Sequence, residues 1–352
     1  MAAVHRRIRR NRRRRGLLPR PRVFRDRGNP LEDLEEEEVY QRYRFRPQTV
    51  LFITAELHDT LESDTNRNQP IPALLQVLIF LRFVATGAHL RLVGDSLGVS
   101  ESSVGRTVKC VASALITILC RRFITFPTGE MALRVKESFR RLAGFPKVLG
   151  CIDCTHVRIS TPKKNEADYV NRKGFHSLNV QMVCDPNFRI TSLCARWPGS
   201  THDSRIWKNS TLFQMFENGA HDGLLLGDSG YPLSKHLMTP HLTTQAPNEE
   251  RFNESLCRTR VLIEQTFGIL KRKFQALHFG IRSTPEQAVV YITACSILHN
   301  IGIERGDTIV SSDCRDINIR NCLQQIVNAN GPVPPARNEG ISKRIAITNG
   351  FF

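Results

Sequence analysis

The sequence is poor in acidic residues and contains no long apolar run. No run approaches the roughly 18 consecutive apolar residues that a membrane span needs, and the first residues lack the apolar stretch of a secretory signal. We therefore expect no membrane partner. Lys and Arg outnumber Asp and Glu by 50 to 33, which gives a formal net charge of +17 over 352 residues. A surplus of this size favours polyanionic partners such as DNA.

Most of this surplus charge lies in one segment. Residues 1–27 hold twelve Arg against a single acid, Asp26, so they carry +11 of the +17. Such a run is typical of a nuclear localisation signal or of an arm that contacts DNA, and a basic leader without a specific role is the alternative. We expect residues 1–30 to form a disordered Arg-rich tail and the protein to occur in the nucleus.

The cysteines lack the pattern of a structural zinc site. The chain has ten, and Cys151 and Cys154 form a CxxC pair, but no second pair follows at zinc-ligand spacing. Because no secretory signal is present, we expect free thiols in a reducing compartment.

Residues 31–145 have the apolar spacing of a helical domain, interrupted by proline and glycine. Within it, residues 92–111 resemble a helix-turn-helix, with Gly98 in the turn and Ser100 as the cap of the second helix. The polar face of that helix presents Arg106 and Lys109, so we predict that both contact DNA. Plain helix packing is the alternative.

Beyond residue 146 the sequence changes to a strand pattern. Residues 148–160, 177–185 and 188–197 are rich in Val, Ile and Leu and predict three strands, followed by a helix over 204–218 and a buried strand over 224–227. This order is that of the RNase H-like fold of DDE transposases and integrases. We therefore predict an α/β catalytic domain over 146–304, and we expect residues 305–352, which are rich in Asn, Gly and Pro, to form a loosely packed C-terminal tail.

Three carboxylates carry the chemical signal. Asp153 lies in an apolar run, Asp228 directly follows a second one, and Glu264 lies 35 residues later at the edge of a buried helical stripe. Hydrolysis of a phosphodiester needs an activated water and a neutralised phosphorane, which two divalent cations roughly 3.5–4 Å apart provide. Hard cations prefer oxygen ligands, so these acids predict a site for two Mg²⁺ or Mn²⁺ ions and a nuclease activity.

Further residues are expected around this site. Asp203 opens the helix predicted after the third strand, where it either caps the helix or joins the metal cluster. We include it among the metal ligands. We expect several cations to bind DNA phosphates, with ordinary surface charge as the alternative. They are Arg172 and Lys173 in a loop before the second strand, and Arg258, Arg260, Lys271, Arg272 and Lys273 on the helix of Glu264.

Five motifs together resemble the PIF/Harbinger transposase superfamily, and most of all its domesticated vertebrate branch of transposase-derived nucleases. They are Cys151-Ile-Asp-Cys-Thr-His156, Tyr169-Val-Asn-Arg-Lys-Gly174, Trp197-Pro-Gly-Ser-Thr-His-Asp203, Gly227-Asp-Ser-Gly-Tyr231 and Ile263-Glu-Gln-Thr-Phe-Gly268. The resemblance places the family's acidic triad on Asp153, Asp228 and Glu264. It also implies dependence on a divalent metal, occurrence in nucleus and cytoplasm, and a separate Myb-like DNA-binding partner protein.

The sequence leaves two alternatives to a metal-dependent endonuclease open. One is a DNA-binding adaptor that keeps the fold without useful turnover, and the other is an active mobile-element transposase. The oligomeric state, including a homo-oligomer, is also left open.

Overall fold

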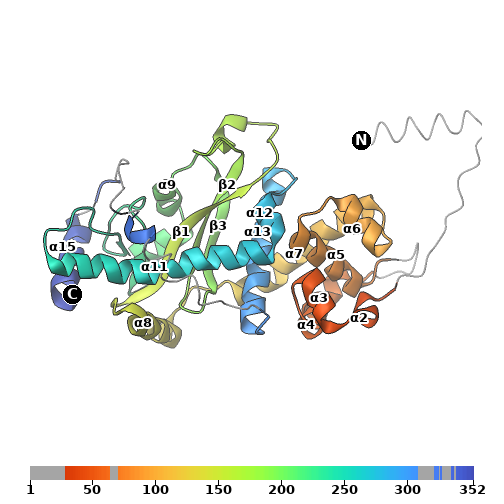
Figure 1. Ribbon diagram of the computed structural model, residues 1–352, viewed down its shortest axis with the longest axis horizontal. Helices are drawn as coiled ribbons and strands as arrows, with labels where there is room; N and C mark the ends of the chain where they lie inside the picture. Colours follow the sequence, from red (N-terminus) through yellow and green to blue (C-terminus); the bar gives the residue numbers. More distant parts are fainter. Residues whose placement is uncertain (1–27, 64–69, 308–320, 325, 327–333, 337) are drawn as a thin grey trace, which may run out of the picture.

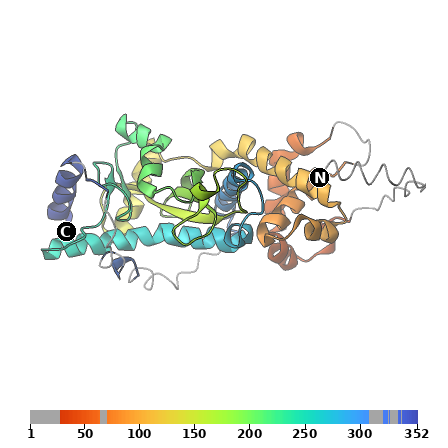
Figure 2. The same cartoon turned by 90° about the horizontal axis from the view of Figure 1, so that it is seen from above.

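The computed structural model describes residues 28–63, 70–307, 321–324, 326, 334–336 and 338–352 (Figure 1). The Arg-rich tail expected over residues 1–30 lies almost wholly outside these residues. The described chain is elongated. A group of helices forms one end, a sheet with its covering helices forms the middle, and the last helix lies at the other end (Figures 1 and 2).

The described residues before the first strand are helical, as the sequence predicts. Pro47 begins one of these helices at its first turn, and Gly87 and Gly144 end two others in the left-handed conformation. The helices are α2 Pro30–Asp33, α3 Glu36–Tyr43, α4 Pro47–Leu61, α5 Ala73–Thr86, α6 Leu90–Leu97, α7 Glu101–Phe123 and α8 Gly129–Ala143.

Helices α6 and α7 form the expected helix–turn–helix. Gly98 turns the chain with a φ of +65°, and the Ser100 hydroxyl accepts a hydrogen bond of 3.3 Å from the backbone N–H of Ser103. Arg106 and Lys109 lie exposed on α7. The geometry of the motif is therefore confirmed, while its contact with DNA stays a prediction.

Helix α7 corrects the expectation about apolar runs. It is 23 residues long with a mean hydropathy of 1.4 in its most apolar window, so by length and composition it is able to cross a membrane. It packs against α4, α5, α6 and α13, and its buried face includes Val104, Val108, Val111 and Leu115. A buried helix inside a packed bundle meets the same criteria of length and composition, so this single helix is weak evidence for a membrane span.

A five-stranded mixed sheet follows, in the spatial order β3-β2-β1-β4-β5. Strand β1 pairs antiparallel with β2 and parallel with β4, while β3 is antiparallel to β2 and β5 parallel to β4. The four predicted strands are confirmed to within a few residues. The strands are β1 Val148–Arg158, β2 Ser177–Cys184, β3 Ile190–Pro198, β4 Leu224–Leu226 and β5 Leu237–Met238.

Helices cover both faces of the sheet. On one face Leu149, Ile152 and Leu225 pack against Trp207 and Phe216 of α9 and α10. The other face packs against α11, which runs across the whole sheet, and against α13 (Figure 1). The covering elements are η1 Glu166–Tyr169, α9 Asp203–Lys208, α10 Thr211–Glu217, α11 Pro247–Lys273, α12 Gln275–Phe279 and α13 Pro285–Glu304.

The single helix predicted over residues 204–218 is two helices. Asn209 ends α9, and the Ser210 hydroxyl then accepts a 3.1 Å hydrogen bond from the N–H of Phe213 and begins α10. A serine that caps a new helix competes with continuation of the old one.

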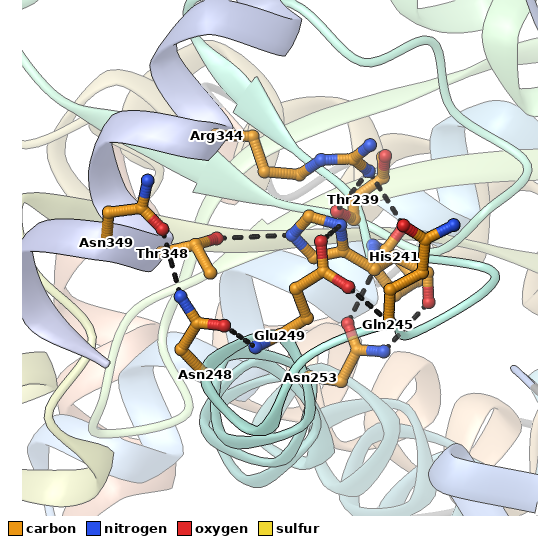
Figure 3. Close-up of polar contacts among 10 residues, drawn as sticks. Thr239, His241, Gln245, Asn248, Glu249, Asn253, Arg344, Thr348 and Asn349 are labelled. Carbon is orange, nitrogen blue, oxygen red and sulfur yellow. Dashed lines mark hydrogen bonds and ion pairs between the residues drawn. The ribbon is translucent and has the colours of Figure 1, made fainter.

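The expected loose C-terminal tail is wrong for its last part. Helix α15, Asn338–Phe351, packs against α11 and β5 through a set of polar contacts (Figure 3). Arg344 donates a 2.9 Å hydrogen bond to the carbonyl of Pro240, and the Thr348 hydroxyl lies 3.1 Å from Nε2 of buried His241. Buried hydrogen bonds of this kind, between residues about a hundred positions apart, hold the helix in place.

Candidate metal and nucleic-acid site

The four predicted acids come from four elements that meet at one edge of the sheet. Asp153 lies on β1, and Asp228 lies two residues after the end of β4, the parallel neighbour of β1. Glu264 lies on α11, which packs on β1, and Asp203 is the first residue of α9. Cys151 of β1 pairs with Leu226 of β4, and each acid lies two residues beyond its member of that pair, so strand pairing brings the first two acids together.

Arg260 on α11 joins two of these acids. Its Nη2 lies 3.1 Å from Oδ2 of Asp153 and 3.8 Å from Oε1 of Glu264, one helical turn further along. The Arg260 side chain is only 4% exposed. A buried guanidinium between carboxylates is held by these charges, because it has no access to bulk water.

Burial and mutual repulsion perturb the acids. Burial, with the charge of Asp228 next, raises the pKa of Asp153 to about 8, although Arg260 opposes the shift. Burial also raises the pKa of Asp203 and of Glu264, and Asp228 again adds to both shifts. Carboxylates that raise one another's pKa share a small volume with too little positive charge. The cluster is therefore a site that favours additional cations.

A polar network fixes Asp203. Its Oδ1 accepts a 2.8 Å hydrogen bond from the side-chain amide of Asn179 on β2, and its carboxylate also interacts with the Cys154 thiol. Cys154 in turn lies 3.2 Å from the hydroxyl of buried Tyr231. The loop before α9 packs closely against the end of η1, because a Cβ at Gly199 would stand 2.6 Å from the carbonyl oxygen of Tyr169. Asp203 is thus placed beside the other acids as well as at a helix N-terminus.

A cleft of about 680 Å³ opens above these residues. Asp203, Asp228 and Arg260 line it. Arg172 and His202 also line it, with Nη2 of Arg172 2.7 Å from Nδ1 of His202, and the charge of Arg172 opposes the rise in the pKa of Asp203. A cleft that combines acids with cations suits a polyanion whose phosphates meet metal ions at the acids.

The acids are of the residue type that binds a hard metal ion, but their side chains are not arranged as metal ligands. Across the described ranges, no group of three or more His, Cys, Asp or Glu side chains is arranged to hold a metal ion. The donor set is all oxygen, which fits Mg²⁺ or Mn²⁺. The crowding of the acids is the observation that supports this fit, because the pKa of Asp153 and of Glu264 stays raised despite Arg260, and the pKa of Asp203 is raised as well.

The predicted DNA-binding cations differ in their exposure. Arg172, Lys173 and Arg272 are exposed, as are Arg106 and Lys109 on α7. Lys271 is half-buried, and its ammonium donates to the Thr155 hydroxyl at 2.7 Å and to the His156 carbonyl at 2.9 Å.

The prediction is wrong for Lys273. Its side chain is buried, its ammonium lies 3.9 Å from the centre of the Phe45 ring, and burial lowers its pKa to about 7. Lys273 follows exposed Arg272 on the same helix, but its side chain is turned about 100° further around the axis and packs against Phe45, which follows α3.

The sequence prediction also missed the residues that pair with the acids or hold them in place. It treated Arg260 as a cation for phosphate, and the structure instead pairs it with Asp153 and Glu264. The spacing of four between Arg260 and Glu264 was the available signal, because residues i and i+4 share a helix face. No sequence signal pointed to Asn179, while Tyr231 is the last residue of the motif Gly227-Asp-Ser-Gly-Tyr231 without an expected role.

Comparison with known proteins identifies relatives. A family model described as "DDE superfamily endonuclease" matches residues 152–300, which include all four acids and Arg260. The chain is 37% identical over 287 residues to the Homo sapiens protein named "Putative nuclease HARBI1", covering 80% of this chain and 82% of that protein. The protein of the same name from Xenopus laevis is 33% identical over the same shares. "Protein ALP1-like" of Arabidopsis thaliana is 28% identical over 70% of this chain and 64% of its own length. No solved structure matches the chain.

Proposed function

The chain belongs to the PIF/Harbinger branch of the DDE superfamily endonucleases, and from this we propose that it is a metal-dependent nuclease that hydrolyses DNA phosphodiester bonds. The single observation that carries the proposal is the grouping of Asp153, Asp203, Asp228 and Glu264, with buried Arg260 paired to Asp153 and Glu264, beside a cleft that Asp203 and Asp228 line. Acidic side chains that repel one another in a cleft are typical of a site that binds a cation.

We include an RNase H-like fold for residues 146–304 in the proposal, preceded by a helical domain over 31–145. The sheet supports it: three antiparallel strands are followed by two strands parallel to the first, in the order β3-β2-β1-β4-β5. The acids then fall on the first strand, two residues after the end of the fourth, and on a later helix.

The residues would divide the work as follows. Two Mg²⁺ or Mn²⁺ ions, when bound, supply the activated water and neutralise the developing charge on phosphorus. Asp153, Asp228 and Glu264 would hold the ions, with Asp203 beside them. Asn179 holds Asp203 in a fixed orientation through its 2.8 Å hydrogen bond.

The cations of the cleft would hold the substrate. Arg172 and His202 line the cleft, and Lys173, the next residue after Arg172, is exposed. These groups would bind the phosphates that flank the reacting one and keep its phosphorus against the acids. The exposed cations of α7 and of the end of α11 would extend this contact along the DNA.

We extend the proposal to the location and partner that the sequence resemblance implies. The protein would act in the nucleus, occur also in the cytoplasm, and work with a Myb-like DNA-binding protein. Cell fractionation of the full chain beside a form whose residues 6–15 carry Gln in place of Arg tests the role of the tail. Equal nuclear fractions for both would contradict it.

The nuclease is tested on supercoiled DNA in Mg²⁺ or Mn²⁺. We expect nicking by the full-length protein and at least a hundredfold loss in Asp228→Asn and in Glu264→Gln. Glu254→Gln is the matched control, because Glu254 is a half-exposed acid on the same helix, paired with Arg258. Nicking that persists in both active-site variants would refute the mechanism. Retention of DNA without any nicking by the unchanged protein would indicate the adaptor.

A further inference from the structure

Two cysteines far apart in the sequence meet beside Arg260. Cys257 lies on α11, three residues before Arg260, and Cys322 lies 65 residues later in the short described stretch 321–324. The two thiols are hydrogen-bonded to each other, and both are buried and free. Three residues along a helix are close to one turn, so Cys257 and Arg260 present their side chains on the same face.

The pair is asymmetric. Cys322 accepts a hydrogen bond of 3.4 Å from Nη1 of Arg260, and it lines the acidic cleft. The hydrogen bond from Cys257 and the charge of Arg260 lower the pKa of Cys322 against the effect of burial. The pKa of Cys257 is raised, first by that same hydrogen bond and then by burial. Cys322 is therefore the nucleophilic sulfur, and Cys257 is the thiol beside it.

We propose that Cys257 and Cys322 form an oxidation site for small hydroperoxides, which converts the two thiols into a disulfide at the floor of the cleft. The Cys322 thiolate attacks the terminal oxygen of the hydroperoxide, the O–O bond breaks, and the alcohol or water leaves with the proton, which gives a sulfenic acid at Cys322. The Cys257 sulfur then attacks the Cys322 sulfur and the S–O bond breaks. Hydroxide leaves with the thiol proton as a second water. Both sulfurs are oxidised by one electron each, and the peroxide is reduced by two.

The disulfide would have two consequences for the molecule. It ties residues 321–324 to α11 beside the residue that pairs with Asp153, and it closes a loop of 65 residues. Closing a loop of this size raises the melting temperature by roughly 5 °C or more for a chain of this length. The cross-link is a property of the two thiols and does not depend on cleavage of DNA.

The same protein contains a matched internal control. Cys151 and Cys184 are directly paired across β1 and β2, and their thiols also interact. That pair is fully buried in the sheet, away from the cleft, and burial, which is the largest cause, raises the pKa of Cys184 well above its ordinary value. Proximity alone would oxidise both pairs, whereas the proposed site oxidises only Cys257 and Cys322.

The experiment treats the folded full-length protein with hydrogen peroxide, blocks remaining thiols after denaturation, and maps the peptides without reduction. We expect a peptide pair linked through Cys257 and Cys322 that dithiothreitol separates. We also expect a rise in melting temperature that Cys257→Ser and Cys322→Ser each abolish. Cys110→Ser, which removes an exposed thiol of α7, should keep both effects. Oxidation of Cys110 without the linked pair would overturn the proposal, and so would linkage of Cys151 to Cys184 at the same rate.

Discussion

Replacement of Arg260 by Gln tests the electrostatic account of the site most directly. The substitution keeps the length and polarity of the side chain but removes the cation that pairs with Asp153 and Glu264 at 3.1 Å and 3.8 Å. Because Arg260 is only 4% exposed, water does not replace the lost charge. We expect the metal-free protein to be destabilised and its response to metal to increase.

The magnitude follows from the burial of the pair. Two charges about 4 Å apart interact by about 4 kcal/mol at an effective dielectric constant near 20, and removal of one partner of a buried pair costs about 3–5 kcal/mol. Proton uptake by the acids recovers part of this cost, so we expect the free energy of unfolding of Arg260→Gln to be lower by roughly 2–4 kcal/mol. In a chain of 352 residues this corresponds to a melting temperature about 3–5 °C lower.

Thermal melting with and without Mn²⁺ measures both effects. Divalent cations bind the folded acids and stabilise by mass action, so Mn²⁺ should raise the melting temperature of Arg260→Gln by several degrees more than that of the unchanged protein. Arg258→Gln is the control, because Arg258 lies two residues earlier on α11 with its side chain 54% exposed and should change stability by less than about 0.5 kcal/mol. An Arg260→Gln protein that melts like the unchanged one, or that responds no more strongly to Mn²⁺, would refute the reasoning.

Three further predictions test the fold and the DNA contacts. Burial lowers the pKa of His299 to about 4, so the unfolded chain binds more protons between about pH 6.5 and pH 4. The free energy of unfolding should fall by about 3 kcal/mol as the pH drops through that window. Urea unfolding at several pH values should show a weaker dependence of this free energy on pH for His299→Gln. Gly340→Ala places a Cβ 2.7 Å from opposing backbone and should cost about 1–3 kcal/mol in thermal melts, whereas Gly350→Ala, with nothing within 4 Å, should be neutral. DNA retention at varied salt gives the slope of the logarithm of the binding constant against the logarithm of the salt concentration. Arg272→Gln should reduce the magnitude of this slope by about one, and Lys273→Gln should leave it unchanged because that side chain is buried.

Local sequence signals predicted the elements of this fold and the acids of the site. The runs of Val, Ile and Leu in β1, β2 and β3 alternate with turns, and each strand lies within a few residues of its predicted bounds. The helix-turn-helix was recognisable because Gly98 and Ser100 perform local tasks, a left-handed turn and a cap, that only a few residue types perform. Signals of this kind involve residues within a few positions of one another, so they can be recognised in a single sequence.

The sequence predictions were wrong where a residue packs against a partner that is distant in the sequence. Lys273 and Arg272 look alike in sequence, yet only the packing of α11 against the N-terminal helices buries the first of them. The docking of α15 depends on partners such as Pro240 and His241, about a hundred residues earlier. Composition alone favoured a loose tail there because Asn, Gly and Pro are abundant in the residues before that helix.

The sequence by itself determined most of the secondary structure, the helix-turn-helix and the choice of Asp153, Asp228 and Glu264, because periodicity, capping and strand ends are local properties. The tertiary structure decided how these acids are held. It set Arg260 between two of them, although 107 residues separate it from Asp153, and it brought Cys322 to the same guanidinium. The charge balance of the site depends on distances in space between residues far apart in the chain, and only the packing of α11 on β1 fixes those distances.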